Sequence, residues 1–217
     1  MTLFMWVLLA VGVLAAAGVL GLMVLVLARR WARTPDRAPV AQIAAADLGD
    51  YFARRAGFCV TVSAQTPLSP SEVFDRLVGR AYLSTLPFLD GPHWVADDVD
   101  TTRGVGSKRT MSGTVYSVSE KVIQYEKDVL IALSGTAVCT PWTIASFAEE
   151  FTIAPTERTG VSEVRWTIAG TPRWVGWLPW RWGAPLTRPV FAFVLRHVLR
   201  VGAFRAPRTR DGRTEGT

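Results

Sequence analysis

Residues that build metal and redox sites are scarce in this sequence. Its 217 residues include two cysteines, Cys59 and Cys139, and two histidines, His93 and His197. Neither pair has the spacing of a metal-binding motif, so no metal site is expected. The cysteines suit free thiols in a reducing compartment. Asparagine is absent, so N-linked glycosylation cannot report on which side of a membrane the chain lies.

The motifs of nucleotide binding and of common hydrolases are also missing. Gly104 and Gly106 form a short Gly-x-Gly, but a third glycine is lacking and no helical pattern follows. This excludes a dinucleotide fingerprint. No phosphate-binding loop, nucleophile elbow or zinc-protease motif occurs, so we expect no cofactor and find no obvious catalytic set.

The positive net charge of +6 is concentrated outside the central part of the chain. Residues 29–40 hold four arginines and one aspartate, and residues 204–217 hold four arginines and two acids. Residues 58–203 carry 14 basic and 13 acidic side chains and are close to neutral. The excess therefore favours contact with anionic lipid headgroups, and no nucleic-acid partner is expected.

One long apolar run opens the chain. Residues 2–28 include no ionisable side chain, and a helix of this length is about 40 Å long, enough to cross a hydrocarbon core of about 30 Å. A cleaved signal peptide would need a positive start and an apolar run of about 7–15 residues before a small-residue cleavage site. The start here is uncharged and the run is about twice that long, which favours a transmembrane helix.

Three arginines directly after this run predict its orientation. Arg29, Arg30 and Arg33 lie next to the end of the apolar segment, and positive residues in this position stay in the cytoplasm. We therefore expect a single-pass membrane protein with its N-terminus outside and its C-terminal domain cytoplasmic.

Composition divides the chain into a transmembrane helix (1–28), a basic juxtamembrane linker (29–57), one domain (58–204) and a disordered basic tail (205–217). The linker contains a weak helical pattern formed by Ile43, Leu48, Tyr51 and Phe52. This pattern fits a helix on the membrane surface and a partly ordered spacer equally well.

The domain begins with a strand and a helix. Apolar residues alternate with polar ones from Phe58 to Gln65, which predicts a strand. Ser69 is a candidate N-cap, Pro70 occupies the first helical position, and Glu72 completes a capping box for a helix that ends near Gly79. A second short helix is expected over residues 82–86.

Strand patterns dominate the rest of the domain. Runs rich in Val, Ile, Thr, Tyr and Trp between Trp94 and Ala169 predict about six strands separated by turns. A Pro- and Trp-rich loop follows, and then a long helix from about Arg188 to Ala203 with one apolar face. Consecutive strands form an antiparallel sheet that must cover its apolar face, so we predict an α+β fold in which a strongly curved sheet wraps around the last helix.

This order of elements resembles the START-like, or SRPBCC, superfamily and its polyketide cyclase/dehydrase-like branch. The local similarities are the segments 69–74, 104–109 and 164–168 and the glutamate at position 120, and the resemblance covers about residues 58–203. It implies the helix-grip fold with an apolar cavity between sheet and helix. Members of the superfamily include binding proteins, transfer proteins and enzymes, so it implies no single activity.

Three polar residues alternate with apolar ones on the predicted strands. Glu120 shares a face with Tyr116, Val118 and Val122; Glu149 shares one with Phe147, Phe151 and Ile153; and Arg109 shares one with Met111. If these faces line the cavity, Arg109, Glu120 and Glu149 are candidates for acid–base catalysis or ligand binding. Two further arrangements remain open: Arg109 pairs with a glutamate across strands, or the face points outward.

The full set of predicted ligand-binding residues combines these strand positions with the last strand, the Trp-rich loop and the final helix. It comprises Arg109, Met111, Tyr116, Val118, Glu120, Phe147, Glu149, Phe151, Trp166, Trp177, Phe191, Val194 and Leu195. The cluster of Trp174, Trp177, Trp180 and Trp182 fits packing on the sheet rim, a lid over the cavity or a bilayer contact.

Three functional hypotheses remain. The first is a membrane-anchored, monomeric domain that binds or carries a hydrophobic small molecule or lipid. The second is a cyclase or dehydratase acting on a polyketide-like substrate. The third is a partner-binding scaffold without a ligand.

Overall fold

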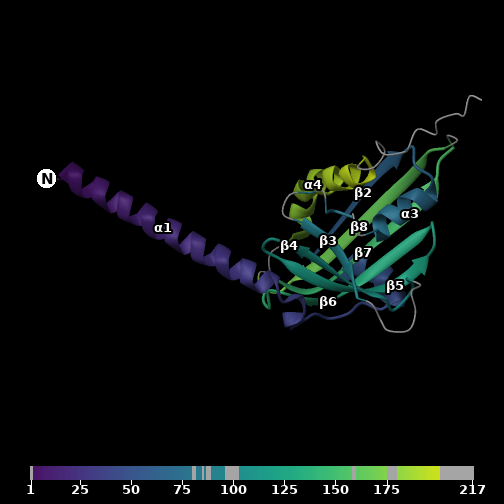
Figure 1. Cartoon of the computed structure of the whole chain (residues 1–217), viewed down its shortest axis with the longest axis horizontal. Helices are drawn as coiled ribbons and strands as arrows, with labels where there is room; N and C mark the ends of the chain where they lie inside the picture. The colour runs from purple at the N-terminus through teal and green to yellow at the C-terminus, as the bar shows by residue number, and fades with distance from the viewer. Residues whose placement is uncertain are drawn as a thin grey trace, which may run out of the picture.

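The computed structural model describes residues 2–79, 82–84, 86, 89–95, 103–157, 160–174 and 180–200. Its centre is one antiparallel sheet (Figure 1). From one edge to the other the strands are β2 (Phe58–Thr66), β8 (Ser162–Pro172), β7 (Ile144–Pro155), β6 (Leu130–Val138), β5 (Ser117–Glu126), β4 (Lys108–Gly113) and β3 (Leu89–Trp94).

A short strand enters the sheet between the diverging ends of β6 and β7. Strand β1 (Ala38–Pro39) pairs with β6, where Ala38 is opposite Val138. Beyond it, the Val40 N–H donates to the Thr136 carbonyl at 3.0 Å, and the Ala41 N–H donates to the Ala145 carbonyl at 2.9 Å. Residues 38–41 therefore satisfy backbone groups that β6 and β7 leave unpaired where they separate.

The helix α3 (Pro70–Val78) is confirmed, and its start follows the predicted capping box. The Glu72 N–H donates to the Ser69 hydroxyl, and the Ser69 N–H donates to the Glu72 carboxylate at 2.8 Å. The second helix, expected over 82–86, was a wrong prediction. Residues 82–84 form a turn in which Leu83 has a φ of 61°, a left-handed conformation that cannot continue a right-handed helix.

In the part of the chain that the structure describes, six strands follow α3, but five of them begin in the predicted region after Trp94 and the first lies earlier in the chain. Strand β3 ends at Trp94, where the sequence pattern placed the start of the strand region. Its Gly91 and Pro92 concealed it, because both residues are typical of turns. The structure accommodates them by placing β3 at the sheet edge, with a register irregularity between Leu89 and Gly91.

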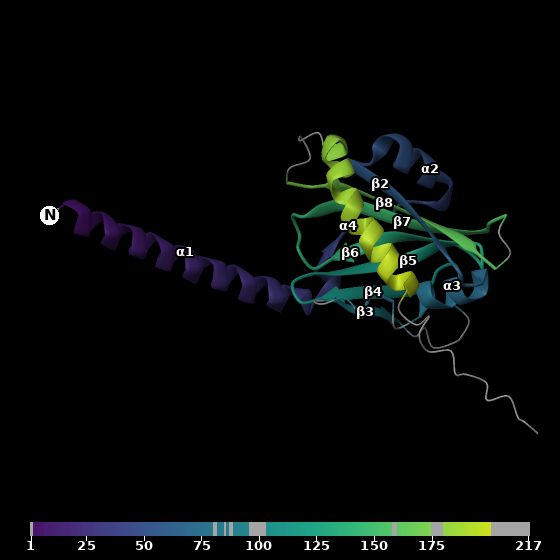
Figure 2. The same ribbon diagram turned by 90° about the horizontal axis from the view of Figure 1, so that it is seen from above.

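The long helix α4 (Trp180–Arg200) lies across the concave face of the sheet (Figure 2). It begins eight residues before the predicted Arg188 and includes Pro185 and Pro189. The predicted helix leaves Pro185 outside and has Pro189 in its first turn, where proline is tolerated, whereas the observed helix holds both prolines in its interior and buries Ala184, Leu195 and Val198. Packing against the sheet therefore overrides the local preference. The predicted end, residues 201–203, lies outside the described residues.

The apolar core lies between α4, α3 and the concave face of the sheet. It includes Val60 and Val62 of β2, Phe74 and Leu77 of α3, and Leu195 of α4. Phe151 and Trp166, on neighbouring strands, stack with their ring centroids 5.3 Å apart. This core closes one end of the space under α4.

The second half of the predicted linker packs against the convex face of the sheet instead of lying on a membrane or acting as a spacer. Residues 45–55 form three short helical turns, η2 (Ala45–Asp47), α2 (Leu48–Asp50) and η3 (Tyr51–Arg55). Ile43, Leu48 and Tyr51 are buried against Ala132, Ala148 and Ala169 of three adjacent strands. The alanines allow this close approach, and the Tyr51 hydroxyl donates to the Ser146 carbonyl at 3.0 Å.

Helix α1 (Thr2–Ala32) extends away from the domain (Figure 1). Its stretch Leu9–Ala32 is long and apolar enough to cross a membrane, and by length and composition it would equally suit a signal sequence. Its last turn contacts the domain: Trp31 packs edge-on against Trp142, with ring centroids 5.0 Å apart. A 3₁₀ turn, η1 (Pro35–Arg37), then leads into β1.

Candidate functional site

A cavity of about 320 Å³ lies between the concave face of the sheet and the middle of α4. Its walls are mostly apolar and come from the sheet, from the turn after α3 and from α4. The lining residues are Phe58, Tyr82, Leu83, Leu89, Met111, Tyr116, Val118, Glu120, Ile144, Phe147, Glu149, Trp166, Ile168, Ala169, Val190, Phe191 and Val194.

The polar part of the wall is a buried cluster of one arginine and two glutamates. Arg109 Nε donates to Glu120 Oε2 at 2.7 Å, across the register pair that joins β4 and β5. Arg109 Nη2 donates to Glu149 Oε1, which comes from β7. The three residues are 1%, 4% and 5% exposed. One guanidinium therefore bridges two carboxyl groups inside an apolar space.

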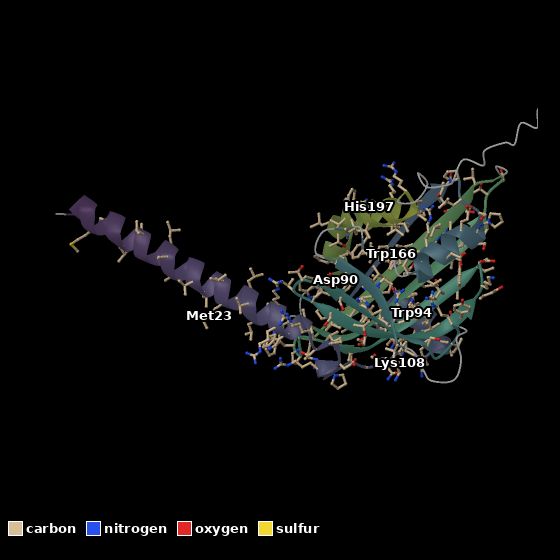
Figure 3. The ribbon with its side chains drawn as sticks, viewed as in Figure 1. Met23, Asp90, Trp94, Lys108, Trp166 and His197 are labelled. Carbon is tan, nitrogen blue, oxygen red and sulfur yellow. The ribbon has the colours of Figure 1, made fainter. Side chains whose placement is uncertain are left out.

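Aromatic residues hold this cluster in place. The Trp166 Nε1–H donates to Glu149 Oε2 at 3.1 Å. The guanidinium carbon of Arg109 lies 5.6 Å from the ring centre of Tyr82 and 5.8 Å from that of Trp94. Cation–π contacts of this kind favour the charged guanidinium, and Figure 3 shows where Trp94 and Trp166 lie in the domain.

Burial and neighbouring charges shift the pKa values of both Glu149 and Arg109. Burial, followed by the neighbouring Glu120 carboxylate, raises the pKa of Glu149 to about 8, although Arg109 and Trp166 both donate to it. Burial opposes the charge of Arg109, but Glu120 and Glu149 together keep its pKa above the ordinary value. At neutral pH the cluster thus holds a charged Arg109 and a largely protonated Glu149.

A further tyrosine at the cavity shares this environment. Burial, followed by the Glu120 and Glu149 carboxylates, raises the pKa of Tyr116 to about 12. Its hydroxyl stays protonated at physiological pH, so it is a hydrogen-bond donor at the cavity wall.

The structure brings most of the predicted site residues together. Nine of them line the cavity: Met111, Tyr116, Val118, Glu120, Phe147, Glu149, Trp166, Phe191 and Val194. Arg109 is not among the lining residues, because both glutamates lie against it and it is almost fully buried. Phe151 and Leu195 belong to the core cluster and do not line the cavity. Trp177 lies outside the described residues.

The sequence left open how Arg109 and the two glutamates are arranged, and the structure combines two of the possibilities. Arg109 pairs with a glutamate across strands, and the same face points inward. The sequence reasoning missed Tyr82, Leu83 and Leu89, which the turn after α3 and strand β3 bring to the cavity. The predicted helix over residues 82–86 hides Tyr82 and Leu83, and Leu89 lies before the predicted strand region.

A glycine makes room for one wall of the cavity. A β-carbon at Gly135 of β6 would overlap the ring of Phe147, which crosses over it from β7. The register between β5 and β6 shifts next to this position, between Ser119 and Glu120. Gly135 therefore lets the Phe147 ring lie flat against the sheet while it lines the cavity.

A second hollow lies outside the cavity, where α1 meets the edge of the sheet. It is formed by Arg29 and Arg33 of the α1 connection and by Asp90, His93 and Thr114 of the β3–β4 edge, with neighbouring small residues. Among the residues that the structure describes, no three His, Cys, Asp or Glu side chains come together as metal ligands.

No protein-family model and no curated protein matches the sequence. Solved structures do resemble it. The hypothetical protein jhp0584 from Helicobacter pylori superimposes with a TM-score of 0.53 at 10% identity, covering 70% of this chain and 90% of that one. Ara h 8.0201 gives 0.50 at 9% identity, covering 65% and 94%. A START superfamily protein from Mycobacterium smegmatis gives 0.47 at 13% identity, covering 64% and 95%.

Identities this low show the fold alone. The curved antiparallel sheet that grips a long C-terminal helix is the START-like helix-grip fold that the order of elements predicted. An activity has to be argued from the cavity itself.

Proposed function

We propose that the protein is a membrane-anchored domain that binds or carries a hydrophobic small molecule or lipid in the cavity under α4. The observation that carries this proposal is the cavity of about 320 Å³, whose wall is mostly apolar and includes the two glutamates of the buried charge cluster. Small-molecule sites are typically concave, mostly apolar and roughly 300–1,000 Å³ in volume, with a few polar groups that fix the orientation of the ligand.

The charge cluster favours one kind of polar group on the ligand. Both glutamates line the cavity, whereas Arg109 is covered and already donates to each of them. A carboxylate ligand would be repelled by the Glu120 carboxylate, because Arg109, the counter-charge of the cluster, is covered and already engaged. A hydroxyl group, in contrast, accepts a hydrogen bond from protonated Glu149 or donates one to Glu120. The ligand is therefore an apolar molecule with a neutral hydrogen-bonding end.

Helix α1 supplies the membrane anchor in this proposal. Its apolar stretch Leu9–Ala32 has the length of a membrane span, and its side chains lie outside the domain. Arg29, Arg30 and Arg33 follow the apolar run, which supports a cytoplasmic position for the domain. Trp31 also packs on Trp142, and this contact between the end of the helix and the domain supports an anchor that stays attached.

The test combines identification of a natural ligand with a defined probe. Mass spectrometry of the full chain purified in detergent should reveal a co-purified hydrophobic compound that is chemically unaltered. Dodecanol should then bind at pH 7 at least several-fold more tightly than dodecanoate. Tight dodecanoate binding would contradict the assignment of a neutral polar end.

A matched pair of valines tests whether the probe enters the cavity. Val118→Trp fills the cavity and should abolish dodecanol binding, because Val118 lines it. Val129→Trp adds the same side chain at an exposed turn and should leave binding unchanged. If both variants bind dodecanol like the unmodified chain, the proposed site is wrong.

A second candidate function rests on the pKa of Glu149. A cavity-lining carboxyl group with a pKa raised to about 8 can donate and take back a proton near neutral pH. This suits acid–base steps such as the cyclisation or dehydration of a polyketide-like substrate. Turnover of the co-purified compound by the full chain, lost in Glu149→Gln, would support the enzyme over the carrier.

A further inference from the structure

The part of the chain that the structure describes leaves one end of the cavity exposed. Two of its lining residues are well exposed, Tyr116 at 38% and Val190 at 61%, and these mark the mouth. Tyr116 closes the β4–β5 turn, where its carbonyl accepts the Gly113 N–H at 2.8 Å. The other end of the space under α4 is filled by Phe74 and Leu77 of α3, both 1% exposed. A ligand therefore enters beside the β4–β5 turn and the middle of α4.

Helix α1 joins the domain at the same end. Trp31 packs on Trp142 in the β6–β7 connection, and Arg33 shares a hollow with Gly113 and Thr114 of the β4–β5 turn. Both ribbon views show α1 meeting one end of the domain, and in Figure 1 α4 begins toward that end (Figures 1 and 2). Asp90, which lines the same hollow, also lies at this end (Figure 3).

The distance to the bilayer follows from helix geometry. Trp31 lies three residues beyond Ala28, where the uncharged run ends, which corresponds to about 4.5 Å along a helix axis. The polar layer on each side of a hydrocarbon core is roughly 5–8 Å thick. The turns that contact the end of α1 are therefore at the level of the lipid headgroups if α1 spans the bilayer.

The surface around the mouth has the composition of such a layer. Trp142 and Trp174 are 50% and 67% exposed, and Trp182 and Leu186 on the outer side of α4 are 83% and 82% exposed. Tryptophan is enriched where proteins cross the headgroup region, and Arg29 and Arg33 beside it attract anionic lipids. The β5–β6 turn at the far end of the sheet carries Glu126, Lys127 and Asp128 instead.

We propose that the mouth of the cavity rests on the bilayer that α1 spans, so that the ligand passes between that bilayer and the cavity without crossing water. The contact surface, called the rim, consists of Val115, Tyr116, Trp142, Trp174, Trp182 and Leu186. This inference rests on the proposed function and adds the source of the ligand, which is the lipid phase of the protein's own membrane.

Two valines with nearly equal exposure provide the test. Val115 on the rim is 40% exposed, and Val129 in the β5–β6 turn is 43% exposed. They lie at opposite ends of β5, whose ten residues span about 30 Å. Val115→Cys and Val129→Cys, each in a chain with Cys59→Ala and Cys139→Ala, would carry an environment-sensitive fluorophore. The full chain is placed in nanodiscs of phosphatidylcholine and phosphatidylglycerol.

The label at position 115 should emit at shorter wavelength than the label at 129. A lipid with a nitroxide on its headgroup should quench the fluorescence of the label at 115 several-fold more strongly than that of the label at 129. Equal, water-like emission from both positions would overturn the proposal. If the cysteine-free chain does not fold, hydroxyl-radical oxidation of the unmodified chain in the same nanodiscs decides instead: Val115 should be oxidised several-fold less than Val129, and equal oxidation would overturn the proposal.

Dodecanol binding in the same nanodiscs distinguishes a failure of the proposed ligand binding from a failure of the proposed bilayer contact. Quenching at position 115 without dodecanol binding would overturn ligand binding in the cavity, and with it the exchange. Dodecanol binding with a water-exposed position 115 would overturn the bilayer contact and leave the proposed function intact.

Discussion

Gly135 lies directly beneath the aromatic ring of Phe147, so close that a β-carbon at position 135 would overlap three atoms of that ring. The pair connects strand register to cavity shape, because Phe147 lines the cavity and Gly135 determines how close its ring lies to the sheet.

Gly135→Ala should push the Phe147 ring away from the sheet and into the cavity. We expect a loss of stability of about 1–3 kcal/mol, typical of overpacking, together with weaker dodecanol binding. Thermal unfolding and probe titration measure the two effects. Gly104→Ala is the control, since a β-carbon there meets no atom within 4 Å. Unchanged binding in Gly135→Ala would show that the ring moves elsewhere.

Glu149→Gln should flatten the dependence of stability on pH. Burial, and then Glu120, raise the pKa of Glu149 from 4.5 to about 8, so the folded state holds its proton more tightly than the unfolded chain does. The resulting stabilisation is fully present below about pH 4.5 and is lost as the pH rises through 8. The unmodified chain should therefore unfold more readily at pH 9 than at pH 5.

Glutamine cannot ionise, so the variant should lose this part of the pH dependence and gain relative stability at high pH. Thermal unfolding of the full chain in detergent between pH 5 and 9 provides the comparison. Glu126→Gln changes an exposed carboxylate and should keep the profile of the unmodified chain. A Glu149→Gln profile that still falls as steeply would show that another group causes the dependence.

Arg109→Met and Glu120→Gln should differ sharply, although they disrupt the same hydrogen bond. Removing Arg109 leaves two buried carboxyl groups without a counter-charge, which should cost about 3–5 kcal/mol and more at high pH. Removing Glu120 leaves Arg109 with Glu149, which can then ionise in its place, so the cost should be smaller. Denaturation at pH 7 measures both.

The triple variant Arg109→Met, Glu120→Gln, Glu149→Gln provides the control for this pair. It removes every charge of the cluster at once, so it should be more stable than Arg109→Met alone. If it is equally unstable, the loss in Arg109→Met comes from packing and not from unpaired charge.

The topology of the chain can be tested with a reporter fused after Thr217. An enzyme that is active only outside the cytoplasm should be silent there, because Arg29, Arg30 and Arg33 keep the adjacent domain inside. A reporter that requires the cytoplasm should be active. The opposite pair of results would reverse the proposed orientation.

The order of elements was predictable because each pattern is local. The capping box of α3 and the alternation on β5 and β7 depend on residues that are near one another in sequence. The same alternation correctly grouped Glu120 with Val118 and Glu149 with Phe147. What it could not provide is the distance between strands: the salt bridge from β4 to β7 depends on register and curvature, which no single strand encodes.

The packing of residues 43–56 was missed for a similar reason. Its apolar residues are too few for a clear helical pattern, and its partners are three alanines, Ala132, Ala148 and Ala169, on separate strands. Small apolar residues at outward positions of adjacent strands were the available signal. They become meaningful only when the strands are placed side by side.

The short connection between α1 and the sheet limits how far the domain can travel. Five residues separate Ala32 from Ala38, and a chain of that length reaches at most about 18 Å when fully extended. The 3₁₀ turn over Pro35–Arg37 and the pairing of β1 with β6 shorten that reach further. If α1 anchors the chain as proposed, such a tether keeps the domain from travelling to another membrane. Any molecule that it binds is then either returned to the bilayer of its own anchor or handed to an acceptor that comes to meet it there.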